Sequence, residues 1–217
     1  MRTLKTIPRS GAILLGMWLL AGCDYKIPAE QATASGEELF QLCQSCHGEN
    51  GQGQPQYHAP DIAGLPQWYI EAQLKKFKSG ARGTHPDDTT GMMMRPMTMS
   101  FHNEGDLKAV AAYVASLPKV VPAPELAGGD ATRGKTLFAP CTACHGPDAA
   151  GNPLVHAPPL NHASDWYLLA QLKKFKEGIR GGNPADIEGA QMRPMANTLP
   201  DEQAMKDVVA HIVALRH

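Results

Sequence analysis

Two five-residue segments of the chain share one spacing of cysteine and histidine residues. The segments are 43–47 (CQSCH) and 141–145 (CTACH). Two thiols separated by two residues can bond to the two vinyl groups of one haem, and the histidine that follows can then reach the iron. We therefore predict two covalent haem c groups, with His47 and His145 as iron ligands and with thioether bonds to Cys43, Cys46, Cys141 and Cys144.

Zinc binding and thiol redox chemistry are the alternative uses of a Cys-x-x-Cys pair. Two such pairs could form one four-cysteine zinc site, but this reading leaves both histidines without a role, and the pairs lie 98 residues apart. A redox-active pair would require a βαβ context, and no alternating strand pattern is present. Haem attachment is the interpretation that uses all six residues.

The chain contains one unit twice. Residues 36–117 match residues 134–215 without a gap, at an offset of 98 residues. The dipeptide Trp68-Tyr69 recurs at this offset, as does the tetrapeptide Met-Arg-Pro-Met that begins at residue 94. We predict two domains, at 36–118 and 130–217, joined by a linker over 119–129 that is rich in proline and glycine.

Apolar residues in each unit recur at the helical spacing. Ile70, Leu74 and Phe77 fall at positions i, i+4 and i+7, and the second unit repeats the pattern. A helix is also expected to lead into each cysteine motif, and another to close each unit and pack on the first. The predicted fold class is all-α, with three to five helices wrapped around one haem in each domain.

The first 35 residues indicate export and attachment to a membrane. Residues 1–22 combine basic residues with a short apolar run, as in a signal peptide. The segment 20–23 (LAGC) resembles the lipobox of bacterial lipoproteins, which implies that Cys23 is lipidated and that Asp24 favours retention at the cytoplasmic membrane. Residues 23–35 would then form a flexible tether. A signal peptide cleaved nearby, or an uncleaved anchor, is the alternative.

The order of the motifs resembles a known family. A class I cytochrome c has its haem motif near the first helix and a methionine ligand before the last helix, and this chain has that layout twice. From about residue 36 to 217 it resembles the tandem dihaem cytochromes of the cytochrome c-four group, including the Q-L-x-x-F-x-x-G-x-R stretch at 73–82 and 171–180. The resemblance implies two haems that lie close together.

The resemblance also implies a methionine as the sixth iron ligand. In the family this ligand lies seven residues before the apolar residue that precedes the last helix, here Phe101 or Leu199. That register selects Met94 and Met192, with Met97 and Met195 as the alternatives. The methionine-rich run 92–99 could instead bind copper(I), but the second unit lacks several of these methionines.

Several repeated residues could bind the haem propionates, or could simply pack helices and loops. The candidates are three pairs of cationic or indole side chains. They are Arg82 and Arg180, Arg95 and Arg193, and Trp68 and Trp166.

We expect an electron carrier rather than an enzyme. The formal net charge is −1 without a basic stripe, which argues against nucleic-acid binding. The expected partners are a quinol-oxidising complex or dehydrogenase as donor and a terminal oxidase or reductase as acceptor, at the periplasmic face of the cytoplasmic membrane. A haem enzyme, such as a dihaem peroxidase or a thiosulfate-oxidising cytochrome, and a fixed subunit of a respiratory complex are the alternatives.

Overall fold

The computed structural model describes residues 30–216 of the 217-residue chain. The predicted signal peptide (1–22), Cys23 and the first part of the predicted tether lie outside the described residues. Within 30–216, none of the helices combines the length and the apolar character needed to cross a membrane.

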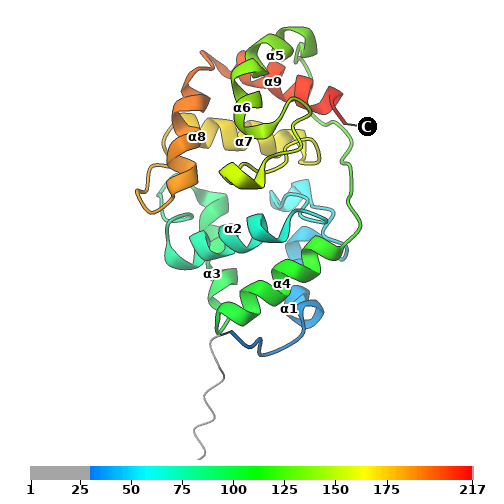
Figure 1. The fold of residues 1–217 in the computed structure, drawn as a ribbon, viewed down its shortest axis with the longest axis vertical. Helices are drawn as coiled ribbons and strands as arrows, with labels where there is room; N and C mark the ends of the chain where they lie inside the picture. Colours follow the sequence, from blue (N-terminus) through cyan, green and yellow to red (C-terminus); the bar gives the residue numbers. More distant parts are fainter. Residues whose placement is uncertain (1–29, 217) are drawn as a thin grey trace, which may run out of the picture.

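The first half of the chain contains four α-helices and occupies the lower part of Figure 1. A short 3₁₀ helix, η1, separates the cysteine motif from the rest. The elements are α1 (Gly36–His47), η1 (Pro55–Tyr57), α2 (Gln67–Ser79), α3 (Thr89–Met99) and α4 (Glu104–Ser116).

The second half repeats this order above the first. Its elements are α5 (Ala131–Phe138), η2 (Ala139–Cys141), α6 (Thr142–His145), η3 (Pro153–Val155), α7 (Asp165–Lys176), α8 (Ile187–Asn197) and α9 (Glu202–Ala214). Between residues 30 and 216 there is no β-strand, only two isolated β-bridges. The predicted all-α fold class is confirmed.

Polar side chains determine where the helices begin. Ser35 and Glu38 form a capping box at the start of α1, in which each side chain accepts a hydrogen bond from the other residue's backbone N–H. Asn103 and Asp201 cap α4 and α9 by accepting bonds from backbone amides of the first turn. These caps fix the first residues of α1, α4 and α9.

The first and last helices of each half form its core. Phe40 of α1 and Leu107 of α4 are fully buried in one cluster, and Val110 extends it. In the second half Phe138 and Val208 occupy the matching positions. Burial of each such side chain contributes about 2 kcal/mol to the stability of the fold. The predicted packing of the last helix on the first is confirmed.

The helix that leads into the second cysteine motif is interrupted, whereas α1 is continuous through the first motif. Pro140 stands where the first half has Leu42. Proline lacks an N–H and crowds the preceding turn, and the chain changes there from α-helix to the 3₁₀ helix η2 before α6. The expected helix therefore leads into the second motif as well, but it ends at Phe138 and a 3₁₀ turn follows before the cysteines.

The segments that contain the Met-Arg-Pro-Met tetrapeptides are helical. Proline is unfavourable inside a helix, yet α3 and α8 contain Pro96 and Pro194 in their interiors. Asp88 and Asp186 cap these helices by accepting hydrogen bonds from the N–H groups of glycines in the first turn. The candidate sixth ligands therefore lie on helices.

The two halves meet along α2 and α7, which lie next to each other in the middle of the molecule, while the linker 119–129 follows one edge (Figure 1). Hydrogen bonds join the loop after α2 to α7, and the loop after α7 to α2. Because equivalent residues bond reciprocally across it, as Arg82 does to Gln171 and Arg180 does to Gln73, the interface has approximate two-fold symmetry.

Candidate haem-binding centre

One continuous cavity of about 500 Å³ is lined by residues from both halves of the chain. It contains both cysteine motifs and all the candidate methionine ligands. The predicted site residues that line it are Cys43, Cys46, His47, Met94, Met97, Cys141, Cys144, His145, Met192 and Met195.

Each motif histidine is buried and oriented by a backbone carbonyl. The Nδ1–H of His47 donates to the carbonyl oxygen of Pro60 at 2.8 Å, and that of His145 donates to Pro158 at 2.9 Å. Burial lowers the pKa of both imidazoles. A neutral ring whose Nδ1 is engaged presents Nε2 as a metal ligand, so both histidines are prepared to bind iron.

None of the motif cysteines is bonded to another cysteine in the described part of the chain. Burial, with a smaller effect from Cys46, raises the pKa of Cys43 to about 11, and burial also raises the pKa of Cys141. Across residues 30–216, no cluster of three or more His, Cys, Asp or Glu side chains is arranged to hold a metal ion. A shared four-cysteine zinc site is therefore not formed.

The candidate methionines differ in exposure. Met94 is partly buried and packs against the core of the first half, whereas Met97 is 37% exposed. In the second half Met192 and Met195 are both partly buried. Burial therefore favours Met94 over Met97 but does not separate Met192 from Met195.

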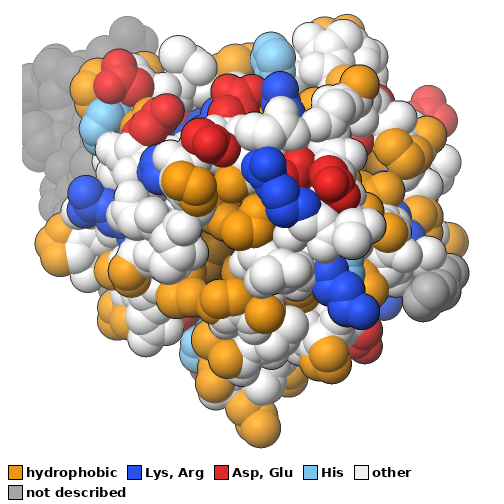
Figure 2. Space-filling view, turned by 90° about the horizontal axis from the view of Figure 1, so that it is seen from above, with side chains coloured by type: hydrophobic (Ala, Val, Ile, Leu, Met, Phe, Trp, Pro, Cys, Tyr) orange, Lys and Arg blue, Asp and Glu red, His pale blue; other side chains and the backbone are white. Residues whose placement is uncertain are grey.

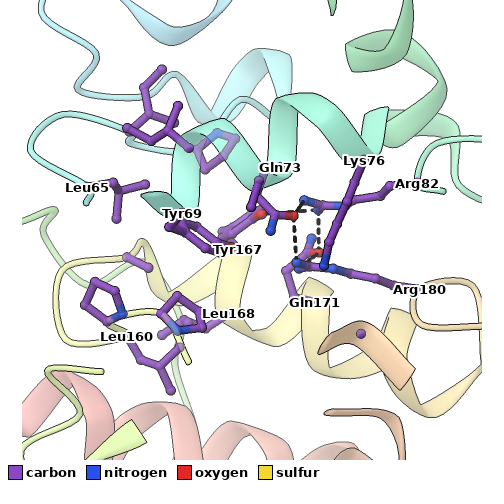
Figure 3. Close-up of a pocket in the computed structure, with 18 of the residues that line it drawn as sticks. Leu65, Tyr69, Gln73, Lys76, Arg82, Leu160, Tyr167, Leu168, Gln171 and Arg180 are labelled. Atoms are coloured by element: carbon purple, nitrogen blue, oxygen red, sulfur yellow. Dashed lines mark hydrogen bonds between the residues drawn. The ribbon is translucent and has the colours of Figure 1, made fainter. Parts of the chain in front are cut away.

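Two arginines and two glutamines form a ring of hydrogen bonds between the halves (Figure 3). Arg82 donates to the side-chain oxygens of Gln73 (2.8 Å) and Gln171 (2.9 Å). Arg180 donates to the same two oxygens, at 2.8 Å to Gln171 and 3.1 Å to Gln73. Each arginine thus binds the glutamine of its own half and that of the other half.

Both arginines bear a charge that the surrounding side chains do not neutralise. Each is only 8% exposed, and neither forms an ion pair with a carboxylate in the described structure. Their Nε atoms are buried without a hydrogen-bond partner. A buried, unpaired charge is costly, so the site suits a ligand with carboxylates, and the two haem propionates satisfy that requirement.

The other candidate propionate partners are placed differently. Trp68 lines the cavity, but Trp166, Arg95 and Arg193 do not. Of the two repeated arginine pairs, only Arg82 and Arg180 line the cavity.

Sequence reasoning missed the residues that connect the halves. Gln73 and Gln171 belong to the repeated stretch quoted above, but the repeat alone does not show that each copy binds the arginine of the other. The same holds for Lys76 and Lys174, each of which binds an aspartate of the opposite half. Their recurrence at the offset of 98 residues was the available signal.

Comparison with known proteins agrees with this arrangement. The family model described as Cytochrome c matches the chain twice, at residues 33–118 and 131–216. The chain therefore belongs to the cytochrome c family, and it carries two covalently attached haem c groups, one in each half.

Two relatives of similar length match most of the chain. The chain is 32% identical to the thiosulfate dehydrogenase electron acceptor of Thiomonas intermedia (strain K12) over 200 residues, which cover 88% of this chain and 85% of the relative. It is 32% identical to cytochrome c4 of Azotobacter vinelandii over 207 residues, or 91% and 94% of the two chains.

A solved structure supports the same conclusion. Reduced cytochrome c4 from Pseudomonas stutzeri has a TM-score of 0.63 and 28% identity, with 82% of this chain and 95% of that chain covered. The protein is thus a dihaem electron carrier similar to cytochrome c4.

Proposed function

We propose that the protein accepts electrons from a periplasmic dehydrogenase or quinol-oxidising complex and passes them to a terminal oxidase or reductase. The observation that carries this proposal is the single cavity that both motifs share. From this shared cavity we infer that the two haems exchange electrons within the chain. One half can then receive an electron while the other half delivers one.

In this proposal, four side chains hold the two irons. His47 and His145 are the proximal ligands, and Met94 and Met192 are the distal ligands. Met97 and Met195 are the alternative distal ligands. When bound, each haem supplies reversible one-electron exchange between Fe(III) and Fe(II). The methionine thioether favours the ferrous state, and a filled sixth position leaves no site for substrate, so the protein transfers electrons without catalysing a reaction of its own.

The donor that we propose in the first instance is a thiosulfate-oxidising dehydrogenase. The support is the relative from Thiomonas intermedia, whose name describes an electron acceptor of such an enzyme and whose length matches that of this chain. The face of the second half shown in Figure 2 has acidic and basic side chains interspersed with apolar ones. Such a mixed surface suits brief docking of a protein partner.

We further propose that a lipid on Cys23 holds the protein at the periplasmic face of the cytoplasmic membrane. The described end of the predicted tether is bonded to the first half, because the backbone N–H and hydroxyl of Thr33 both donate to the carboxylate of Asp106, at 2.7 and 2.8 Å. The domains would therefore stand near the membrane. Cys23→Ser should release the protein into the soluble periplasmic fraction, and an unchanged membrane fraction would refute the lipid anchor.

Rapid mixing tests the function. The oxidised protein is mixed with a purified thiosulfate dehydrogenase and thiosulfate, and the absorbance of ferrous haem is followed. We expect both haems to become reduced, and then to be reoxidised by membranes that contain a terminal oxidase. No reduction would refute the proposed donor. If no oxidase reoxidises the protein and it turns over peroxide at enzymatic rates, the carrier role is wrong.

A further inference from the structure

Asp61 of the first half is bonded to the second half. Its side chain is 6% exposed, and its Oδ1 accepts hydrogen bonds from the backbone N–H (2.8 Å) and the hydroxyl (2.5 Å) of Ser164. Ser164 is the N-cap residue of α7 and is 4% exposed. The contact is buried and joins residues 103 positions apart in the chain.

Ser164 is itself held in place by its neighbours. The guanidinium of Arg216 donates to the carbonyl oxygens of Ala163 (2.5 Å) and Pro122 (2.7 Å). Asp165 accepts hydrogen bonds from the backbone N–H groups of Glu125 and Leu126. Because the residues on both sides of Ser164 are fixed to the linker, Ser164 is a rigid anchor for Asp61.

Asp61 directly follows the residue that orients the proximal histidine. The peptide group between Pro60 and Asp61 contains the carbonyl oxygen that accepts the Nδ1–H of His47 at 2.8 Å. A stronger bond at Nδ1 makes the imidazole a more basic ligand, which stabilises ferric iron and lowers the reduction potential. Any constraint on this peptide group therefore acts on the iron through His47.

The second half lacks the corresponding constraint. His145 donates to the carbonyl oxygen of Pro158 at 2.9 Å, but the residue that follows is Pro159. Proline has no carboxylate and no N–H, so this peptide group cannot be held in the same way. The second haem-binding half can therefore serve as a control for the first. The carbonyl group that accepts from His47 is constrained by the other half, whereas the one that accepts from His145 is not.

We propose that Asp61 is a positioning residue that holds the Pro60 carbonyl against His47 from the second half of the chain, and so sets the reduction potential of the first haem only. The inference rests on His47 as a haem ligand, as in the proposed function. It makes the potential of one haem depend on how the two halves are docked.

Three variants separate positioning from charge. Asp61→Ala removes both the anchor and the carboxylate. Asp61→Asn keeps an oxygen that can accept from Ser164 but removes the charge. Ser164→Ala leaves the charge and removes one donor. Asp87→Ala is the control, because it removes an exposed carboxylate of the same half that is not bonded to the second half.

The readouts are the two reduction potentials from a spectroelectrochemical titration and the NMR shifts of the His47 ring protons in the ferric protein. We expect Asp61→Ala to shift the ferrous-to-ferric equilibrium of the first haem about fivefold toward ferrous, the change that one hydrogen bond typically makes. Ser164→Ala should shift it in the same direction by less. Asp61→Asn and Asp87→Ala should leave it within about twofold.

Two results would overturn the proposal. If Asp61→Asn shifts the first haem as much as Asp61→Ala, the carboxylate acts through its charge alone. If Asp61→Ala and Ser164→Ala leave both potentials and the His47 ring shifts unchanged, the contact does not act on the iron. Because Ser164→Ala retains the backbone bond, it keeps the test usable if Asp61→Ala fails to fold. Reduction by the dehydrogenase, measured on the same variants, shows separately whether the carrier role holds.

Discussion

Lys76 of α2 lies 2.5 Å from Asp186, the residue that caps α8 in the other half. The repeat copies of these residues, Lys174 and Asp88, form the same contact in the opposite direction, also at 2.5 Å. Asp186 and Asp88 are almost fully buried. Each half therefore neutralises the buried carboxylate that begins the methionine-containing helix of the other half.

Removal of Lys76 should destabilise the protein. Lys76→Met leaves Asp186 without its cation, and breaking a buried ion pair in this way costs about 3 kcal/mol of the free energy of unfolding. Lys75→Met is the matched control, because Lys75 is exposed and its ion pairs with Glu71 and Glu104 contribute about 0.5 kcal/mol. Urea unfolding measures both. Equal losses in the two variants would show that the interface pair stabilises the fold no more than an exposed ion pair does.

Glu188 should make the interface sensitive to acid. A hydrogen bond from Lys76 is the main cause that lowers the pKa of Glu188 from 4.5 to about 2. Because the pKa is lower in the folded than in the unfolded protein, this interaction stabilises the fold above about pH 4.5 and is lost as the pH falls toward 2. The side chain is 34% exposed, so solvent screening reduces the contribution to about 1 kcal/mol.

The repeat supplies the variant that tests this pH dependence. Thr90 occupies the position equivalent to Glu188 and accepts a bond from Lys174 at 2.5 Å. Glu188→Thr should therefore lower the free energy of unfolding by about 1 kcal/mol at pH 6, with no difference from the parent protein at pH 2. Urea unfolding across this range is the measurement. If the two proteins differ in free energy of unfolding by the same amount at every pH, the pKa of Glu188 is not lowered by folding.

Gly134 should not tolerate a side chain. A Cβ at this position would overlap the backbone carbonyl oxygen of Asp207, where α5 crosses α9. Gly134→Ala should lower the free energy of unfolding by about 3 kcal/mol through overpacking. Thr132→Ala, at an exposed position of the same helix, should change it by no more than about 0.5 kcal/mol. If Gly134→Ala leaves the free energy of unfolding unchanged, α5 and α9 can move apart at no cost.

The sequence predicted the parts of this structure that follow from local pattern. The heptad-like face of Ile70, Leu74 and Phe77 is buried as expected, and Gly80 ends α2 in the left-handed conformation. The cysteine motifs predicted haem c because the spacing of the two cysteines matches the two vinyl groups to which they attach. These features depend on neighbouring residues alone, so one sequence is enough to identify them.

The parts that could not be predicted depend on how the halves meet. The repeat shows that Lys76 and Asp88 each have a copy, but not that each lysine binds the aspartate of the other copy. The Asp61–Ser164 contact has no repeat partner, so no sequence signal marked it. Pro140 was visible in the sequence, but its effect depended on whether the surrounding helix would continue through a 3₁₀ turn.

The two methionines of each tetrapeptide can be distinguished by substitution. Met94→Ala should remove about half of the ferric absorbance band that arises from thioether-to-iron charge transfer, because one of the two haems loses its distal ligand. Met97→Ala should keep the band. Met192→Ala and Met195→Ala should behave in the same way for the second haem. Loss of the band with Met97→Ala but not with Met94→Ala would reverse the assignment.

The optical spectrum of the ferric protein, with haem quantified per chain, is the most direct test of a dihaem carrier with both sixth positions filled. The account predicts two haems per chain, low-spin iron and the full thioether-to-iron band. One haem per chain would contradict the equivalence of the two halves. High-spin iron would show an open coordination position and would favour catalysis over electron transfer.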